Sequence, residues 1–182
     1  MTLVVALLVF VPMLVEALRS ARNERTQLAR GGIEPGGDVY ELMRVAYPAS
    51  FVIMMLEGAW RGSMPVTLVV GGAAVFAIAK LLKWWAILTL GHAWTFRVIV
   101  VPGARLVGNG PYRFLRHPNY VGVVGEFVGV LLMTGAFVTG PVVTVAFIVL
   151  LLRRTVVEER SLRPFDKHRA VPSEAEGRQT HS

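Results

Sequence analysis

Four long runs of apolar residues, at 1–18, 39–56, 65–90 and 120–152, limit what this chain can fold into. The first run is nearly uninterrupted and is about as long as a helix needs to cross a hydrocarbon core of ~30 Å. Only 17% of the residues are charged, against about 25% in soluble domains, and the mean hydropathy is +0.55. The sequence therefore predicts an all-α integral membrane protein.

The fourth run is too long for a single span. One helix over 120–152 would measure about 50 Å, and both Gly135 and the Gly140-Pro141 pair disfavour its continuation. We expect a C-terminal hairpin of two short helices, which gives about five transmembrane helices in all. The run at 39–56 fits either a tilted span or a half-buried helix, since three residues interrupt it: Glu41, Arg44 and Pro48.

Basic residues are distributed unequally around these runs. Residues 19–44, 80–116 and 153–182 hold all the Lys and Arg of the chain except Arg61. By the positive-inside rule, these three segments face the cytoplasm and the N-terminus lies outside. The basic residues follow the first run instead of preceding it, which favours a retained helix over a cleaved signal peptide.

A polar stretch, GPYRFLRHPNYVG at 110–122, lies directly before the predicted hairpin. The residue before a proline is kept out of the helical region, so His117 should end a loop, with Asn119 as the N-cap of the next helix. Free N–H groups at this helix N-terminus would favour a carboxylate or a phosphate. Alternatively, Arg113 and Arg116 serve only as anchors to lipid phosphates.

A second polar cluster follows the return helix of the hairpin, at Arg153, Arg154, Glu158 and Glu159. Arg154 and Glu158 are four residues apart and share a helix face. An exposed pair of this kind is usually solvated and contributes little to stability. If the hairpin closes, however, the pair returns to the membrane face of His117, and two clusters at one interface favour a shared site.

The stretch LVGNGPYRFLRHPNYVG, followed after an apolar hairpin by RRTVVEERSL, resembles the isoprenylcysteine carboxyl methyltransferase family and its phospholipid methyltransferase relatives. Those are multi-helix membrane enzymes that use S-adenosylmethionine. Upstream, SARNERTQLARGGIEPGG resembles the bacterial branch, some members of which methylate products of type III polyketide synthases. The resemblance implies a single methyltransferase domain at 1–172 of a bacterial plasma membrane protein, with the catalytic part at about 89–165 and the active site facing the cytoplasm. Residues 173–182 are expected to be a disordered polar tail.

The resemblance also implies site residues. Glu158 matches a glutamate that binds the cofactor, and Arg154 matches an arginine implicated in acceptor binding, so Arg154 and His117 are the expected catalytic residues. The family's cofactor-binding positions fall on Leu106, Val107, Tyr112, His117, Pro118, Asn119, Tyr120 and Glu158. No metal is expected. The tail departs from the family pattern, since it reads FDKHRAVP with His168 in a tyrosine-like place.

Methyl transfer from a sulfonium mainly requires that donor and acceptor are aligned and that water is excluded. We expect a lipophilic acceptor that enters from the bilayer and a water-soluble donor that enters from the cytoplasm. A carboxylate acceptor needs no general base, whereas a hydroxyl acceptor would gain from one, with His117 or Glu159 as candidates. Isoprenylcysteine, a phospholipid amine, a fatty acid and an alkylated pyrone or resorcinol all satisfy these requirements.

Two other functions compete with this hypothesis. Membrane sterol and steroid reductases, which use NADPH, are similar in carrying an Arg-His-Pro-Asn-Tyr-like block, but they usually have tryptophan where this chain has Tyr112. The Glu158-Glu159 pair also fits the methyltransferases better. A non-catalytic membrane scaffold would require both polar clusters to be coincidental. Nucleic acid is not an expected partner, despite a net charge of +7, because no aromatic residues interleave the arginines.

Three further features lie inside the apolar runs. Glu126 is the only ionisable residue between 120 and 152, and it either lines an acceptor tunnel or pairs near the interface. Gly122, Gly125 and Gly129 have the spacing of a close-packing helix face. A basic and aromatic group is predicted to lie at the lipid headgroups: Lys80, Lys83, Trp84 and Trp85.

Overall fold

The computed structural model describes residues 2–104 and 107–166, with the side chains of 162–166 excepted. Within these ranges, regular structure consists of helices and one isolated β-bridge between Ile33 and Val100. The five α-helices are α1 (Thr2–Ala29), α2 (Tyr40–Arg61), α3 (Val66–Leu90), α4 (Pro118–Thr134) and α5 (Thr139–Asp166). The prediction of an all-α fold is confirmed for the described residues.

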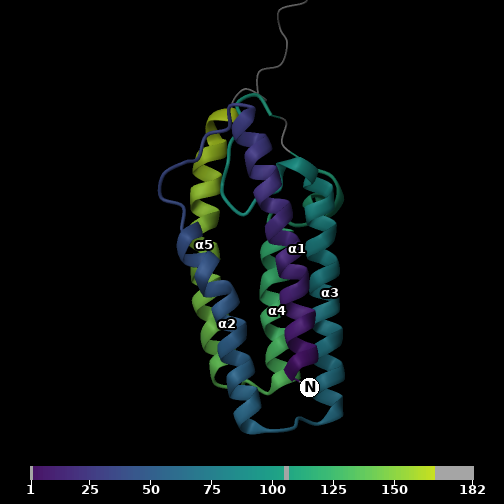
Figure 1. Cartoon of the computed structure of the whole chain (residues 1–182). Coiled ribbons are helices and arrows are strands. Elements are labelled where there is room, and N and C mark those ends of the chain that lie inside the picture. Colours follow the sequence, from purple (N-terminus) through teal and green to yellow (C-terminus); the bar gives the residue numbers. More distant parts are fainter. Residues whose placement is uncertain (1, 105–106, 167–182) are drawn as a thin grey trace, which may run out of the picture.

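The helices form an elongated bundle (Figure 1). The loops from α1 to α2 and from α3 to α4 lie at one end, and the loops from α2 to α3 and from α4 to α5 lie at the other. By length and composition α1, α2, α3 and α5 can cross a membrane, whereas α4 has only 17 residues. Large apolar side chains such as Leu7 and Ile78 are exposed on their outer faces, as lipid-facing residues are. The chain is an integral membrane protein.

The predicted hairpin is confirmed, and its turn spans residues 135–138, beginning at Gly135. Helix α4 ends at Thr134, and Gly135 adopts a left-handed conformation with φ of 72° while its N–H donates to Leu131 O at 2.8 Å. Gly140 and Pro141 lie in the first turn of α5, where a proline is tolerated because its missing N–H would have no intrahelical partner. Helix α5 is therefore a long helix of 28 residues instead of the short one that the sequence predicted.

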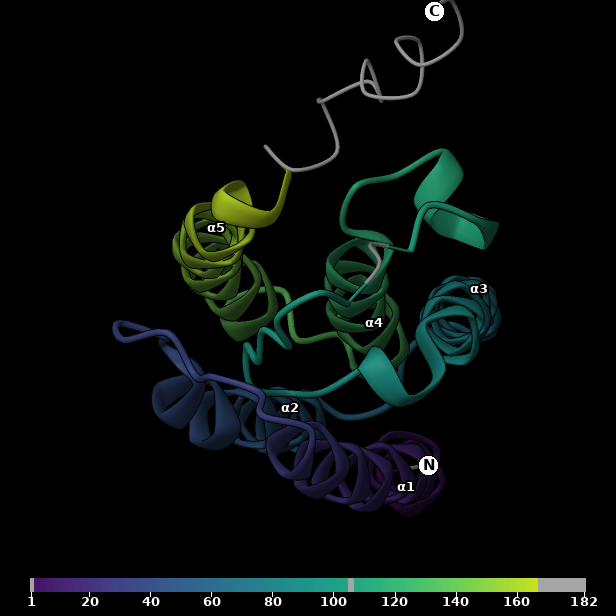
Figure 2. The same ribbon diagram turned by 90° about the horizontal axis from the view of Figure 1, so that it is seen from above.

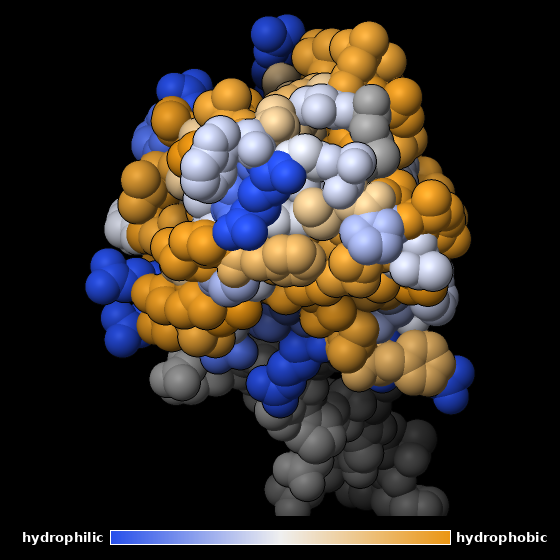
Figure 3. All heavy atoms as spheres, turned by 90° about the horizontal axis from the view of Figure 1, so that it is seen from below, coloured by the Kyte–Doolittle hydropathy of each residue, from blue (hydrophilic) through white to orange (hydrophobic). Residues whose placement is uncertain are grey.

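At the end of the bundle that carries the α2–α3 and α4–α5 loops, Glu57 of α2 binds the start of α5. Its carboxylate accepts hydrogen bonds from the backbone N–H of Val138 (3.1 Å) and of Thr139 (2.7 Å), and from the Thr139 hydroxyl (2.6 Å). A carboxylate at a helix N-terminus satisfies N–H groups that have no partner within the helix. Apart from a small hydrophilic area, the surface at this end is mainly hydrophobic (Figure 3).

Helices α3 and α4 pack through glycines. A Cβ atom on Gly129 would lie 2.7 Å from Phe76 Cβ, and one on Gly72 would lie 2.7 Å from Gly129 O. A Cβ atom on Gly125 would lie 2.8 Å from Ala79 Cβ. Real Cβ atoms do not come this close to other heavy atoms. The backbones of α3 and α4 can therefore approach each other this closely only because these positions are glycine. The close-packing face predicted on α4 is confirmed.

Lys80 and Lys83 do not lie at the headgroups, and that prediction is wrong. The Lys83 side chain is buried and the Lys80 side chain is 11% exposed, and both lie between helices, where they meet Glu16 of α1 and Glu126 of α4. Lys80 Nζ lies 2.9 Å from both Glu16 Oε1 and Glu126 Oε1. Lys83 Nζ lies 2.6 Å from Glu16 Oε2 and 3.4 Å from Glu126 Oε1. We call these four residues the ion cluster.

Tyr47 of α2 joins the ion cluster, because its hydroxyl donates to Glu126 and accepts from Lys83 Nζ at 3.2 Å. The cluster is neutral overall, with two cations and two anions. Buried charges are tolerated when they are paired in this way. Of the two alternatives for Glu126, the structure supports pairing, although the partners lie within the bundle and not at the interface.

Replacing Gly129 by alanine should lower the free energy of unfolding by about 1–3 kcal/mol, because the added Cβ overlaps the Phe76 backbone and forces α3 away. Thermal unfolding of the detergent-purified protein measures this. Gly71 is the matched control, since a Cβ there meets nothing within 4 Å. Gly71→Ala should be neutral or slightly stabilising. Equal losses in both variants would contradict the packing argument.

Glu126→Gln should destabilise the protein by about 3–5 kcal/mol, because it leaves Lys80 and Lys83 with one carboxylate between them. Adding Lys80→Met restores neutrality, and we expect this double variant to unfold at a higher temperature than Glu126→Gln alone. A double variant that is less stable than the single one would show that charge balance is not what the cluster provides.

Candidate functional site

A cavity of about 1040 Å³ lies at the end of the bundle where the α1–α2 and α3–α4 loops meet. In Figure 2, which looks onto this end, α1 and α2 lie on one side and α4 and α5 on the other. The cavity has an apolar wall, which includes Phe10, Met13, Met43, Phe147 and Leu151. Its polar wall includes Tyr112, His117, Asn119, Tyr120, Arg154 and Glu158. Ligand pockets usually measure about 300–1000 Å³, so this cavity can hold more than one small molecule.

Tyr112 reaches the cavity from a short helical turn, Gly110–Arg113. Gly110 has φ of 57°, and a Cβ there would lie 2.6 Å from Thr89 Oγ1, so the turn requires glycine at this position. Burial and the nearby Glu158 carboxylate raise the pKa of the Tyr112 phenol. Tyr112 therefore stays protonated at physiological pH and can donate a hydrogen bond.

His117 ends the loop in a non-helical conformation, with φ of −129° and ψ of 65°, as its place before Pro118 predicts. The prediction that Asn119 caps α4 is wrong. His117 holds the cap position and Pro118 opens the helix, which places Asn119 inside the first turn. The Asn119 side chain lines the cavity instead, and its Oδ1 is buried without a hydrogen-bond partner among the described residues.

Glu158 of α5 is the point where the two polar clusters meet. The Tyr120 hydroxyl donates to Glu158 Oε1 at 2.5 Å, and Arg154 Nε donates to the same oxygen at 3.3 Å. His117 Nδ1 lies 3.5 Å from Glu158 Oε2. The His117 ring also stacks on the Tyr120 ring with centroids 5.2 Å apart. The predicted proximity of the two clusters is confirmed.

The remaining predicted site residues do not all lie at the cavity. Val107 lines the cavity, whereas Pro118 is buried in the first turn of α4. Leu106 lies outside the described residues, as do His168 and the tail at 173–182. Glu159, the second candidate base, is half-exposed and pairs loosely with the exposed Arg116 at 3.8 Å.

Residues 94–101, which we call the mouth loop, cross the open end of the bundle and line the cavity. Helix α1 holds them in place. Asn23 Nδ2 donates to Trp94 O at 2.7 Å, and Ser20 Oγ accepts from Phe96 N–H at 2.7 Å. Gln27 Nε2 donates to His92 O, just before the loop, at 3.0 Å.

These α1 residues were missed by the sequence prediction, which ended the first helix at residue 18. The helix continues to Ala29. Its buried polar residues, Glu16, Ser20, Asn23 and Gln27, follow one another at intervals of four, three and four. That spacing marks one helix face, and it is the signal from which the inner polar stripe could have been predicted.

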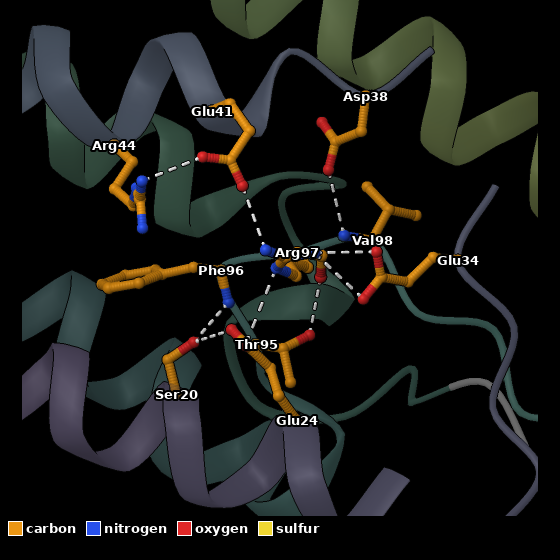
Figure 4. A network of polar contacts seen from close by, with 10 residues as sticks. All are labelled: Ser20, Glu24, Glu34, Asp38, Glu41, Arg44, Thr95, Phe96, Arg97 and Val98. Carbon is orange, nitrogen blue, oxygen red and sulfur yellow. Dashed lines mark hydrogen bonds and ion pairs between the residues drawn. The ribbon is translucent and has the colours of Figure 1, made fainter. Parts of the chain in front are cut away.

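Arg97 binds the mouth loop to α1, to the loop between α1 and α2, and to α2 (Figure 4). Its guanidinium lies 2.9 Å from Glu34 Oε2, 3.0 Å from Glu41 Oε1 and 3.9 Å from Glu24 Oε2. The hydrogen bond to Glu34 raises the pKa of Arg97. From the sequence, Arg97 was predicted only to be one of the basic residues that face the cytoplasm.

The fold and the cavity together define an integral membrane protein with a large cavity at one end of its bundle. Residues 72–164 match the isoprenylcysteine carboxyl methyltransferase (ICMT) family. The chain belongs to this family, whose general activity is methyl transfer. The match covers most of α3 together with α4 and α5, so it contains the polar wall of the cavity.

Two curated relatives resemble the chain over most of its length. It is 30% identical over 163 residues to the uncharacterized protein YpbQ of Bacillus subtilis (strain 168), a stretch that covers 90% of this chain and 96% of the relative. It is 27% identical over 146 residues to an uncharacterized protein of Haemophilus influenzae (strain ATCC 51907 / DSM 11121 / KW20 / Rd), with 79% and 84% covered. No solved structure matches the chain.

Proposed function

We propose that this protein transfers a methyl group from S-adenosylmethionine to a lipophilic acceptor at the cytoplasmic surface of a bacterial plasma membrane. One observation carries the proposal: a single cavity is bounded by a polar wall from α4 and α5 and by an apolar wall from membrane-length helices. A charged, water-soluble donor suits the first wall, and a lipophilic acceptor suits the second. Membership of the ICMT family supports the same reaction class.

The polar wall offers what S-adenosylmethionine would need. Asn119 Oδ1 is a buried acceptor without a partner among the described residues, and it suits an amino group or a hydroxyl of the ligand. The Glu158 carboxylate can hold the ammonium or the ribose hydroxyls. His117 and Arg154 lie beside it and can balance the charge of the ligand carboxylate. Tyr112 and Tyr120 add aromatic surface for the adenine.

S-adenosylmethionine supplies an activated methyl group on a positively charged sulfur. The protein's part is then to orient both molecules and to keep water away. Arg154 is placed to hold the polar head of the acceptor, since its buried guanidinium lines the cavity next to Glu158. The mouth loop covers the open end. No base is needed if the acceptor is a carboxylate; for a hydroxyl acceptor, His117 would take the proton, with Glu158 orienting its ring through Nδ1.

The acceptor proposal follows from the apolar wall. Phe10, Met13 and Leu14 of α1, with Met43 and Pro48 of α2, bring lipid-facing helices to the cavity. We propose that the acceptor's chain enters between these two helices. An isoprenylcysteine, a phospholipid amine, a fatty acid and an alkylated pyrone or resorcinol would each fit such a route.

The cytoplasmic orientation rests on the positive-inside rule. With Lys80 and Lys83 assigned to the ion cluster, the other basic side chains of the described residues lie toward the cavity end, except for Arg61. The rule places this end in the cytoplasm, where the water-soluble donor is available.

The first experiment measures calorimetric binding of S-adenosylhomocysteine and, separately, of NADPH to the detergent-purified protein. We expect saturable binding of S-adenosylhomocysteine, weakened about tenfold or more by Glu158→Gln, because a charged acceptor is removed from the polar wall. Glu41→Gln is the control, since this carboxylate is exposed and does not line the cavity. Binding of NADPH alone would refute the methyltransferase proposal and favour the reductase.

A further inference from the structure

Arg154 is held from two sides by carboxylates that belong to different parts of the chain. On its own helix, Glu158 Oε1 lies 3.3 Å from Arg154 Nε. From the loop before α2, Asp38 Oδ1 lies 3.8 Å from Arg154 Nη1. The Arg154 side chain is only 7% exposed, so both carboxylates interact with it under weak screening by water. Two partners in different directions fix a guanidinium better than one.

Asp38 has a second contact, with the mouth loop. Its Oδ2 accepts a hydrogen bond from the backbone N–H of Val98 at 3.2 Å, as Figure 4 shows. Its Oδ1 is buried and makes no hydrogen bond among the described residues, so Arg154 is the charged group it faces. One carboxylate therefore joins the loop that covers the cavity to the arginine that lines it.

Asp38 does not itself line the cavity. Any effect it has on a ligand must pass through Arg154 or through the mouth loop. Without the charge of Asp38, Glu158 would be the one close anion left to Arg154, and the guanidinium would be drawn further toward Glu158 Oε1. That oxygen already accepts from Tyr120 at 2.5 Å, and a stronger pair with Arg154 would compete with a ligand for it.

We propose that Asp38 is a positioning residue that couples closure of the mouth loop to the orientation of Arg154, so that the binding site is complete only while the loop lies across it. This inference rests on the proposed function for its ligand but not for its geometry. Residue 38 precedes the family match at 72–164. The coupling is thus a property of the N-terminal part of this chain acting on the α5 wall.

The two contacts of Asp38 can be separated by substitution. In Asp38→Asn the side-chain oxygen still accepts from Val98 N–H, but the charge that faces Arg154 is lost. Asp38→Ala removes both contacts. Glu41→Gln is the matched control for loss of a carboxylate near the mouth: Glu41 is exposed, and its partner Arg97 keeps Glu34.

The first readout is calorimetric binding of S-adenosylhomocysteine. Asp38→Asn should weaken binding about tenfold or more, because a displaced Arg154 misplaces the site around it, while Glu41→Gln stays within about twofold. Asp38→Asn should have no further effect in an Arg154→Gln background, since its action passes through that arginine. Unchanged binding in Asp38→Asn, or additive effects in the double variant, would overturn the proposal.

The second readout needs no ligand. Because the chain has no cysteine, Val98→Cys introduces a single buried thiol into the mouth loop, and its rate of alkylation by a maleimide reports how often the loop opens. Asp38→Ala should speed alkylation about fivefold or more. Arg154→Gln should also speed it, because it leaves the buried Asp38 carboxylate without its cation.

The two readouts separate the two proposals. If the unsubstituted protein does not bind S-adenosylhomocysteine, the proposed function fails, and the alkylation rates alone decide the coupling. Faster alkylation in Arg154→Gln then supports it. An alkylation rate unchanged by Arg154→Gln would show that the loop and Arg154 are independent and would overturn the inference.

Discussion

Four helices of this bundle meet at one buried and electrically neutral group of charges, the ion cluster with Tyr47. Uncompensated charge is costly away from water, so the three helices that carry the charges must present them at the same depth and toward the same point. The cluster thereby fixes the rotation and the height of α1, α3 and α4. Tyr120 lies six residues from Glu126 on α4, about 9 Å further along the helix axis. The polar wall of the cavity is built on that register.

The cavity is built from two parts of the chain, one within the family match and one before it. The polar wall belongs to α4, α5 and the loop before them, which lie within the family match. The apolar wall comes largely from α1 and α2, which precede the match, and these helices also hold the mouth loop. Variation in the N-terminal helices can therefore change which acceptor fits and how the mouth closes while the polar wall stays the same. Asp38 is the residue that connects the two parts.

Much of this arrangement could be predicted from local sequence. Apolar length gave the membrane helices, Gly135 gave the turn of the hairpin, and glycine spacing gave the packing of α4. The Arg154 and Glu158 pair was placed near His117 by the hairpin alone. The failure at Lys83 has a clear cause: the role of this residue depends on partners that local patterns do not specify. Lysine near tryptophan is typical of a headgroup belt, and only the facing Glu16 and Glu126 make burial of Lys83 acceptable.

The sequence by itself determined that the chain is helical, that it lies in a membrane, and that its polar residues gather before and after a C-terminal hairpin. Those properties follow from hydropathy, glycine and proline, which act over a few residues. Only the tertiary structure decided which polar groups face one another. Asp38, Val98 and Arg154 come from three distant segments, and their contacts exist because the ion cluster and the α3–α4 glycines set how the helices pack. Such contacts depend on packing across the whole bundle, which leaves no periodic signature in the chain.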